Sequence, residues 1–248
     1  MLTALRQHYH RLAAALSAAV PSPCALCSES GTDGICGACR ERFFSARPAR
    51  CRRCAHRLHA GFGESAICGR CIKREPSFDE TIVAADYAPP LDQLILALKF
   101  GDNLALAPLF SRLLADALFE QRATTPVPDV LVAVPLGQRR LAERGFNQAL
   151  EMARPLSRAL GIALEPRLIV RVRETNEQAR LPPDERRKNV HGAFALPAGM
   201  GKRIQGMHVG VVDDVVTTGE TMNTIATTLK RHGAARVTCL ALARTPPN

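Results

Sequence analysis

Eight of the nine cysteines occur as four Cys-x-x-Cys pairs in the first 71 residues. Each pair can form a tight turn that presents two thiolates to one metal ion, and two turns complete the closed tetrahedral set of a structural zinc site. We expect neighbouring pairs to combine, because this arrangement needs the shortest loops; interleaved pairs, or eight thiols without a metal, are the alternatives. The predicted Zn²⁺ ligands are Cys24, Cys27, Cys36 and Cys39 in one site, and Cys51, Cys54, Cys68 and Cys71 in the other.

The segment that carries these cysteines has few large apolar side chains and cannot bury a sufficient core by itself. Zinc binding can supply the missing folding free energy, on the order of 10 kcal/mol or more per site. We therefore expect chelation to unfold residues 20–75.

A second chemical signal is the stretch VGVVDDVVTTGET at 209–221. An apolar strand leads to two adjacent carboxylates, and a threonine-rich turn follows before a helix. The carboxyl ends of strands are where open α/β sheets bind ligands, and backbone N–H groups at a helix N-terminus suit a phosphate. Two neighbouring carboxylates can accept hydrogen bonds from vicinal hydroxyls, so the combination fits a ribose 5-phosphate. The alternative is a plain strand end with a helix that Thr217 or Thr218 caps.

This stretch resembles the 5-phosphoribosyl 1-pyrophosphate (PRPP) motif of type I phosphoribosyltransferases. Two further segments, VPLGQRRLAERGFNQALEMA (134–153) and RETNEQARLPPDERRKNVHGAF (173–194), fit the same family, as does LKFGD (98–102). With the cysteine pairs, they make the chain similar to the ComF family of competence protein F and GntX-like phosphoribosyltransferases. The resemblance covers residues 20 to 244 approximately.

The resemblance implies PRPP as ligand, with Mg²⁺ across its pyrophosphate and ribose hydroxyls. It implies that residues 173–190 form a loop that closes over the site and that residues 135–140 contact pyrophosphate. Lys99 is a further phosphate candidate, the alternative being a cation at a helix C-terminus. The implied catalytic pair is Asp213 and Asp214. The implied PRPP-binding residues are Thr217, Thr218, Gly219, Glu220, Thr221, Lys99, Arg139, Arg140 and Arg144.

Three functions remain open at this point. The first is phosphoribosyl transfer with pyrophosphate release to an acceptor that the sequence does not identify. The second is a binding protein without turnover that engages single-stranded DNA and the DNA-uptake machinery, in line with the family's link to natural transformation. The third is a PRPP-sensing regulator. Arginines between the cysteine pairs could contact a phosphate backbone, or could simply offset the charge of the zinc thiolates. They are Arg40, Arg42, Arg47, Arg50, Arg52, Arg53 and Arg57.

The elements that must position these residues alternate along the second part of the chain. Apolar runs predict strands, amphipathic runs predict helices, and this alternation predicts an α/β fold with a parallel sheet. The predicted strands are 81–87, 129–136, 168–172, 208–216 and 236–243. The predicted helices are 91–100, 104–119, 147–160 and 221–232, with Pro155 expected to kink or split the third.

Length and composition agree with a globular protein of two domains. The 248 residues carry a net charge of +10, and two zinc–thiolate sites would lower it to about +6, which still favours polyanionic partners. No apolar run reaches about 18 residues, so no membrane span is expected, and paired thiols fit a cytoplasmic metalloprotein. We expect an amphipathic helix over 1–19 (a secretory signal being the alternative), a double zinc ribbon over 20–76 and a phosphoribosyltransferase-like domain over 77–248.

Overall fold

The computed structural model describes residues 22–31, 34–46, 48–59, 61, 66–121, 126–173 and 192–246. The chain forms two compact units, Met1–Ala46 and Arg47–Asn248. The boundary between them falls inside the cysteine-rich segment, so the second set of four cysteines belongs to the same unit as the sheet. The helix predicted over 1–19 lies outside the described residues.

The first unit is small and built around its cysteines. Strands β1 (Ser22–Pro23) and β2 (Ser30–Gly31) pair antiparallel, and helix α2 (Gly37–Phe44) follows. Apart from cysteines, the buried hydrophobic side chains in its described part are Ile35 and Phe44. So small an apolar core agrees with the expectation that metal binding supplies much of the folding free energy here.

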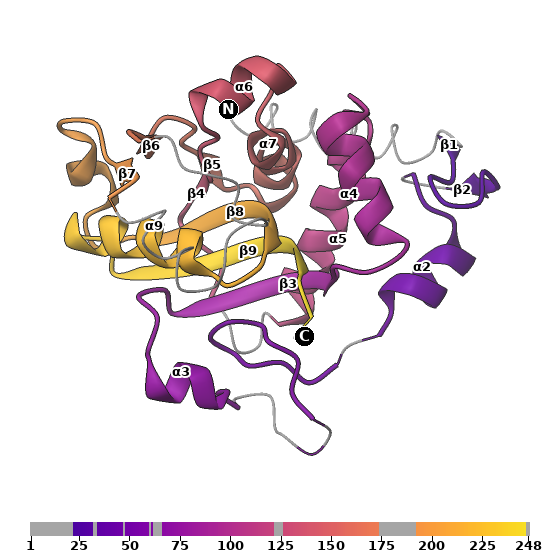
Figure 1. Cartoon of the computed structure of the whole chain (residues 1–248), viewed down its shortest axis with the longest axis horizontal. Coiled ribbons are helices and arrows are strands. Elements are labelled where there is room, and N and C mark those ends of the chain that lie inside the picture. Colours follow the sequence, from indigo (N-terminus) through magenta and orange to yellow (C-terminus); the bar gives the residue numbers. More distant parts are fainter. Residues whose placement is uncertain are drawn as a thin grey trace, which may run out of the picture. The chain divides into compact units, whose positions relative to one another are not determined.

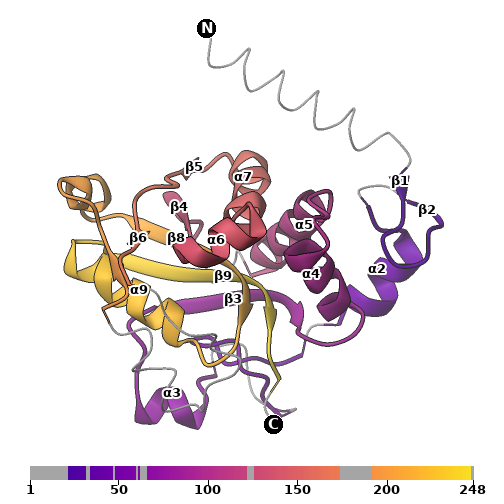
Figure 2. The same ribbon diagram turned by 45° about the horizontal axis from the view of Figure 1, so that its top comes forward.

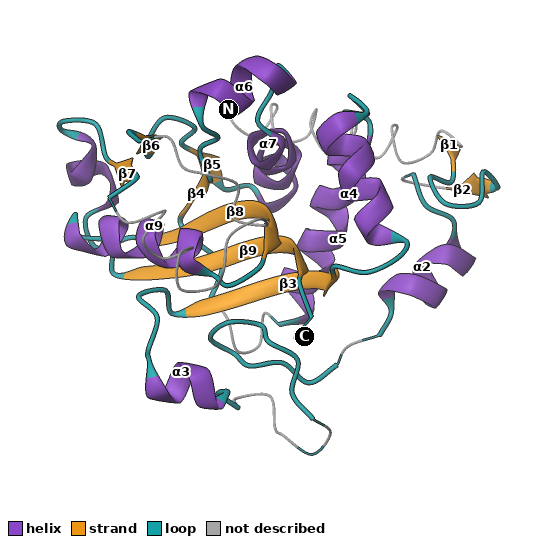
Figure 3. Cartoon of the chain, viewed as in Figure 1, coloured by secondary structure: helices purple, strands orange, loops and turns teal. Residues whose placement is uncertain are grey.

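The second unit is built on a five-stranded sheet in the order β3-β9-β8-β4-β5, in which every neighbouring pair is parallel. Figure 1 shows these strands stacked side by side, and Figure 3 separates them from the helices by colour. The predicted parallel α/β sheet is confirmed. Because the strands are parallel, their carboxyl ends meet at one edge. The strands are β3 (Glu80–Asp86), β9 (Arg236–Arg244), β8 (His208–Val216), β4 (Val130–Ala133) and β5 (Ala163–Leu164).

Helices cover both faces of this sheet. Helix α5 packs against β3 and β9, and α7 packs against β8 and β4, while α9 lies on the opposite face, as Figure 2 shows. The hydroxyl of Ser111 on α5 donates to the carbonyl of Met152 on α7 at 2.6 Å, which ties these two helices together. The helices of this unit are α3 (Gly69–Lys73), α4 (Leu91–Phe100), α5 (Leu106–Glu120), α6 (Gln138–Arg144), α7 (Gln148–Leu160) and α9 (Glu220–Arg231).

Local sequence signals explain the ends of α7. The Asn147 side chain caps its N-terminus by accepting from the backbone of Ala149 and Leu150, and Gly161 ends it with a φ of 69°. The helix continues through Pro155, so the split that proline made possible does not occur.

The segment 168–172 was predicted to be a strand, and it contributes only β6 (Val170–Arg171). This strand pairs antiparallel with β7 (Phe194–Ala195) and not with the main sheet. The short 3₁₀ helix η2 (Met200–Ile204) then precedes β8. Among the described residues, none of the helices combines the length and apolar character needed to cross a membrane.

Candidate functional site

The two adjacent acids lie near the carboxyl end of β8, a central strand of the sheet. Asp213 is half-buried, whereas Asp214 is only 4% exposed. Each carboxylate accepts a hydrogen bond from the next backbone N–H, at 2.9 Å for Asp213 and 2.8 Å for Asp214. Successive side chains of a strand point to opposite faces, so the two carboxyl groups have different surroundings.

Lys99 lies in the last turn of α4 and reaches across to the sheet. Its ammonium group is 2.6 Å from Oδ2 of Asp214. The structure therefore brings together two residues that are far apart in the sequence and were both predicted to belong to the site. A contact between Lys99 and a phosphate stays a prediction.

The surroundings separate the pKa values of the two acids. Burial raises the pKa of Asp213 well above its usual range, and the neighbouring Asp214 charge raises it further. Burial opposes ionisation of Asp214 as well, but the Lys99 ammonium, together with hydrogen bonds from Asp213 and the Val215 backbone, outweighs burial and lowers the pKa of that carboxyl. The surroundings therefore push the pKa values of the two neighbouring acids apart, upward for Asp213 and downward for Asp214.

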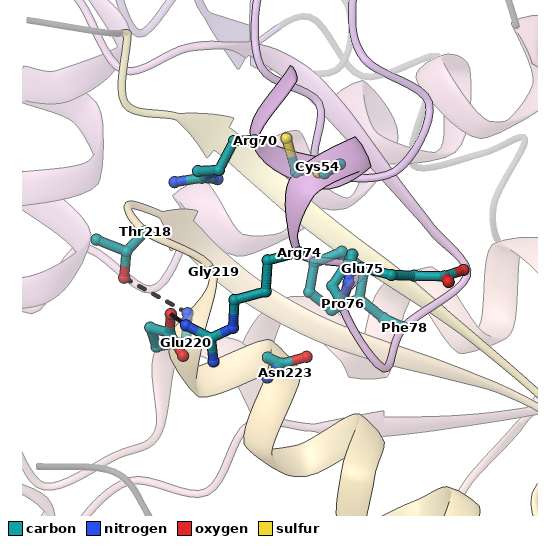
Figure 4. Close-up of a pocket in the computed structure, with 11 residues that line it drawn as sticks. Cys54, Arg70, Arg74, Glu75, Pro76, Phe78, Thr218, Gly219, Glu220 and Asn223 are labelled. Carbon is teal, nitrogen blue, oxygen red and sulfur yellow. Dashed lines mark hydrogen bonds and ion pairs between the residues drawn. The ribbon is translucent and has the colours of Figure 1, made fainter. Parts of the chain in front are cut away.

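The turn after β8 leads directly into the N-terminus of α9. Gly219 is the N-cap and has a φ of 85°, a conformation that glycine adopts without strain. The hydroxyl of Thr218 accepts from the backbone N–H of Glu220 at 3.4 Å (Figure 4). The first backbone N–H groups of a helix have no partner within the helix. Residues 217–221, called the phosphate loop below, therefore have the form that suits an anion.

A cavity of about 100 Å³ lies beside the phosphate loop. Figure 4 shows Thr218, Gly219 and Glu220 on one side, and opposite them Arg70 of helix α3 and Arg74, the residue that follows this helix. The Arg74 guanidinium is 3.9 Å from the Glu220 carboxylate. These two arginines were not among the predicted site residues, and no motif in the sequence distinguishes them from surface arginines. The remaining lining residues are Cys54, Cys71, Glu75, Pro76, Phe78 and Asn223.

The residues after β4 form a helix where a loop was predicted. Helix α6 begins at Gln138, so the predicted pyrophosphate loop 135–140 ends in its first turn. Arg139 is exposed and pairs with Glu143 at 3.5 Å, and Arg140 is half-buried. The guanidinium of Arg144 lies 5.2 Å from the centre of the Phe100 ring. Phe100 directly follows Lys99 in the sequence and is the last residue of α4. Of the three predicted arginines, Arg144 is thus placed next to the end of α4.

The eight paired cysteines form two clusters with the sequential grouping that was expected. Within each cluster, all four sulfur atoms lie within 4.8 Å of one another. The Sγ atoms of Cys27 and Cys36 are 3.6 Å apart, and those of Cys54 and Cys68 are 3.7 Å apart. A tetrahedral zinc ion with bonds of about 2.3 Å needs sulfur atoms about 3.8 Å apart. The residues of both clusters therefore fit structural zinc sites.

Arginines around the second cysteine cluster form ion pairs that hold the cluster against the edge strand of the sheet. Arg50 and Arg57 both pair with Asp86 at 2.8 Å. Arg52 lies 3.3 Å from Glu80, whose side chain is only 3% exposed. These arginines were candidates for contacts with nucleic acid, and the structure uses them in ion pairs within the second unit.

The same segment covers the edge strand β3. The backbone N–H of Thr81 donates to the carbonyl of Arg52 at 3.2 Å, so the second cluster shields a strand edge that could otherwise pair with another chain. Of the predicted closing loop 173–190, residues 174–190 lie outside the described residues.

Two family models match the chain, a double zinc ribbon domain over residues 15–72 and a phosphoribosyl transferase domain over residues 146–247. The chain is 40% identical over 231 residues to DNA utilization protein YhgH of Escherichia coli, across 91% of this chain and 98% of that protein. It is 32% identical over 214 residues to competence protein F of Haemophilus influenzae, across 86% of this chain and 91% of the relative. The chain belongs to the ComF family.

Among solved structures, this ComF-family chain is similar to a purine phosphoribosyltransferase from Pyrococcus horikoshii. The identity is 22% and the TM-score 0.34, over 56% of this chain and 72% of the other. The predicted resemblance to the ComF family is confirmed by the relatives, and the predicted fold by the domain models together with the parallel sheet. The chain is therefore a phosphoribosyltransferase-like protein linked by its relatives to competence and DNA utilization.

Proposed function

We propose that this ComF-family protein binds PRPP at the carboxyl end of β8. One observation carries the proposal: two adjacent acids on a central strand, one of them paired with Lys99, are followed by a loop that leads into the N-terminus of α9. Carboxylates suit the vicinal hydroxyls of a ribose, and backbone N–H groups suit its 5-phosphate. The spacing between Asp213 and Gly219 brings both kinds of group to one edge of the sheet.

Each residue has a distinct part in this proposal. Asp213, the more exposed acid, accepts from the ribose hydroxyls, while Lys99 holds Asp214 ionised beside it. The phosphate loop receives the 5-phosphate. Mg²⁺ enters as part of the substrate, bound to the pyrophosphate and the ribose of PRPP. Arg144 is the best placed of the three α6 arginines to contact the pyrophosphate, because it stacks on Phe100 at the end of α4.

We further propose that the bound PRPP is a donor for phosphoribosyl transfer. The bond between the anomeric carbon and the pyrophosphate oxygen breaks, the pyrophosphate leaves with the electron pair, and an acceptor atom bonds to the carbon. Positioning and charge stabilisation supply most of the rate in such a reaction. A carboxyl with a raised pKa, as in Asp213, can take up the acceptor's proton near neutral pH when it has given up its own.

Calorimetric titration with Mg-PRPP tests the binding proposal. The Asp213→Asn variant keeps the size of the side chain and replaces one carboxyl oxygen with an amide group, and we expect at least about tenfold weaker binding, because a hydrogen bond from a ribose hydroxyl is lost. Asp129→Asn is the matched control, since Asp129 is an exposed aspartate at the start of β4, on the other edge of the sheet. Equal affinities for the two variants would contradict the proposal.

Pyrophosphate release separates an enzyme from a protein that binds PRPP without turnover. We expect release from PRPP in the presence of an acceptor drawn from nucleobases, amines or single-stranded DNA, and its loss in Asp213→Asn. If no member of these classes gives release while PRPP still binds, the chain acts as a PRPP-dependent binding protein or sensor.

A second candidate function is contact with single-stranded DNA through the first unit. Helix α2 exposes Phe43, and the guanidinium of Arg42 lies 5.2 Å from the centre of its ring. An exposed aromatic ring next to an arginine suits a stacked base and its phosphate, and relatives are named for DNA utilization and competence. We expect binding with a steep salt dependence that weakens in Arg42→Ala and Phe43→Ala.

Arg154→Ala is the control for that experiment, because Arg154 is an exposed arginine on α7. Equal salt slopes and affinities in all variants would exclude α2 as the DNA contact. Replacing Arg50 or Arg52 is a less clean test, because it also removes ion pairs that hold the second cluster on the sheet, and replacing Arg53 removes an ion pair with Glu75. Since both cysteine clusters need reduced thiols, we place the protein in the cytoplasm.

A further inference from the structure

Arg244 is the last residue of β9 and is almost completely buried, with 3% exposure. Its Nε donates to the carbonyl of Cys54 at 3.0 Å. Its Nη1 donates to the carbonyl of Val216 at 2.9 Å and also to the carbonyl of Thr217. A single planar guanidinium thus connects a ligand of the second cysteine cluster to the start of the phosphate loop.

The contacts at the loop end orient the groups that would bind a phosphate. In a trans peptide the C=O and the following N–H point in opposite directions. Because Arg244 holds the carbonyls of Val216 and Thr217 towards itself, the N–H groups of Thr217 and Thr218 point away from it. Two donors of the phosphate loop are therefore oriented before any ligand arrives, which reduces the entropy lost on binding.

The contact at the cluster end depends on the turn between Cys51 and Cys54. The N–H of Ala55 donates to the carbonyl of Cys51 at 2.8 Å, and Ala55 has a φ of 55°, which is rare for alanine. This tight turn places both of its sulfur atoms where they can bind one metal ion. A bound metal therefore fixes the direction of the Cys54 carbonyl that Arg244 requires.

Burial makes this arrangement sensitive to the loss of one acceptor. A buried guanidinium needs hydrogen-bond acceptors because its charge is removed from water. If the Cys54 carbonyl moves away, the guanidinium must leave its position or lose that hydrogen bond. Either change alters how firmly the two loop carbonyls are held.

We propose that Arg244 is a positioning residue that couples metal loading of the second cysteine cluster to the conformation of the phosphate loop. Zinc in this cluster then has a role beyond folding the ribbon, since its loading sets the affinity of a site on the sheet. By reciprocity, a ligand in the phosphate loop raises the affinity of the cluster for that zinc ion. The identity of the ligand as PRPP rests on the function proposed above, whereas the coupling itself concerns only the protein.

Arg244→Lys tests the proposal in the full-length, zinc-loaded chain. An ammonium group cannot span the Cys54 and Thr217 carbonyls as a planar fork does. We expect faster amide hydrogen exchange over residues 215–221, at least about tenfold weaker binding of Mg-PRPP, and faster release of one of two zinc ions to a chelator. Arg236→Lys is the matched control, because Arg236 begins the same strand and pairs with Glu80 at 2.8 Å, far from the loop.

A second pair of variants removes the metal instead of the arginine. Cys68→Ser disables the second cluster and leaves Cys54 in place, while Cys36→Ser disables the first cluster as control. We expect only Cys68→Ser to speed exchange over 215–221. Adding Arg244→Lys to it should weaken PRPP binding little further, because both changes break one connection. If Cys68→Ser does not fold, zinc release from Arg244→Lys decides the question.

The outcomes separate this proposal from the proposed function. If Arg244→Lys shows wild-type exchange and wild-type zinc release, the coupling is wrong, even where PRPP binds normally. If the wild type binds no PRPP but Arg244→Lys speeds both exchange and zinc release, the coupling stands and PRPP is the wrong ligand. Equal effects of Cys36→Ser and Cys68→Ser on the loop would also overturn the coupling.

Discussion

Replacing Lys99 with methionine removes the cation beside a buried carboxylate and keeps nearly the same length of side chain. The ammonium of Lys99 is 2.6 Å from Asp214, and the side chains are 20% and 6% exposed, respectively. Removing one partner of a buried ion pair costs about 3–5 kcal/mol. Because water reaches part of Lys99, we expect the lower end, about 3 kcal/mol.

The pH dependence of this loss has a definite sign. In the wild type, the Lys99 charge outweighs burial and lowers the pKa of Asp214 below its unfolded value, so the pair stabilises the fold above that value and stops doing so in acid. In Lys99→Met, the charge that opposes burial is gone, and only the hydrogen bonds from Asp213 and the Val215 backbone still oppose it, so the pKa of Asp214 rises. The penalty is then present at neutral pH and shrinks as the pH falls through the raised pKa.

Hydrogen exchange of the β8 peptide measures the free energy of opening for the wild type, Lys99→Met, Asp214→Asn and the double variant. We expect the loss of opening free energy in the double variant to be clearly smaller than the sum of the losses in the two single variants, since the double variant leaves no unpaired charge. Urea unfolding at two pH values, followed by circular dichroism, gives the pH dependence. A loss below about 1 kcal/mol in Lys99→Met, or strict additivity in the cycle, would refute a buried pair.

Three other perturbations probe different parts of the structure. Burial lowers the pKa of His208, whose Nε2 lies 2.8 Å from the Thr238 hydroxyl. The wild type should therefore lose more unfolding free energy than His208→Gln as the pH falls below about 6.5, where the unfolded histidine takes up its proton, and parallel urea curves would contradict this. Gly210→Ala places a Cβ 2.6 Å from Leu131 Cδ2 and should cost about 1–3 kcal/mol in urea unfolding, whereas Gly69→Ala, whose Cβ meets nothing within 4 Å, should cost little. Chelation should release two zinc ions per chain and remove hydrogen-exchange protection around both cysteine clusters, and retained protection after release would show that metal is not needed for their fold.

Strong local patterns explain why much of the fold could be predicted from the sequence. The apolar run of β8 and the amphipathic stretch of α4 were placed within a residue or two, because their burial follows from side-chain spacing. Helix α6 was missed, since none of its residues is buried and it has no apolar face to signal a helix. The four-cysteine clusters were grouped correctly because loop length alone favours sequential pairs.

The candidate site was predictable only in its local part. Asp213, Asp214 and the phosphate loop are contiguous, so their chemistry is visible in one stretch of sequence. Contacts between distant residues are not, and neither the ion pair of Lys99 with Asp214 nor the bridge made by Arg244 has a sequence signal. Composition also placed a domain boundary near Pro76.

The compact units part between Ala46 and Arg47, and the domain boundary near Pro76 stays a prediction. Ion pairs such as those of Arg50 and Arg57 with Asp86 hold the second cluster on the sheet, and composition does not report such packing. Cysteine content therefore predicts which residues bind metal. Which segments pack into one compact unit depends on contacts such as these ion pairs.

A crystal structure of the zinc-loaded chain with Mg-PRPP tests the central claim most directly. The account predicts density for the 5-phosphate at the backbone N–H groups of residues 217–221, with the ribose hydroxyls within hydrogen-bond distance of Asp213. Density for PRPP at another place, with the phosphate loop and both acids free of ligand, would contradict it.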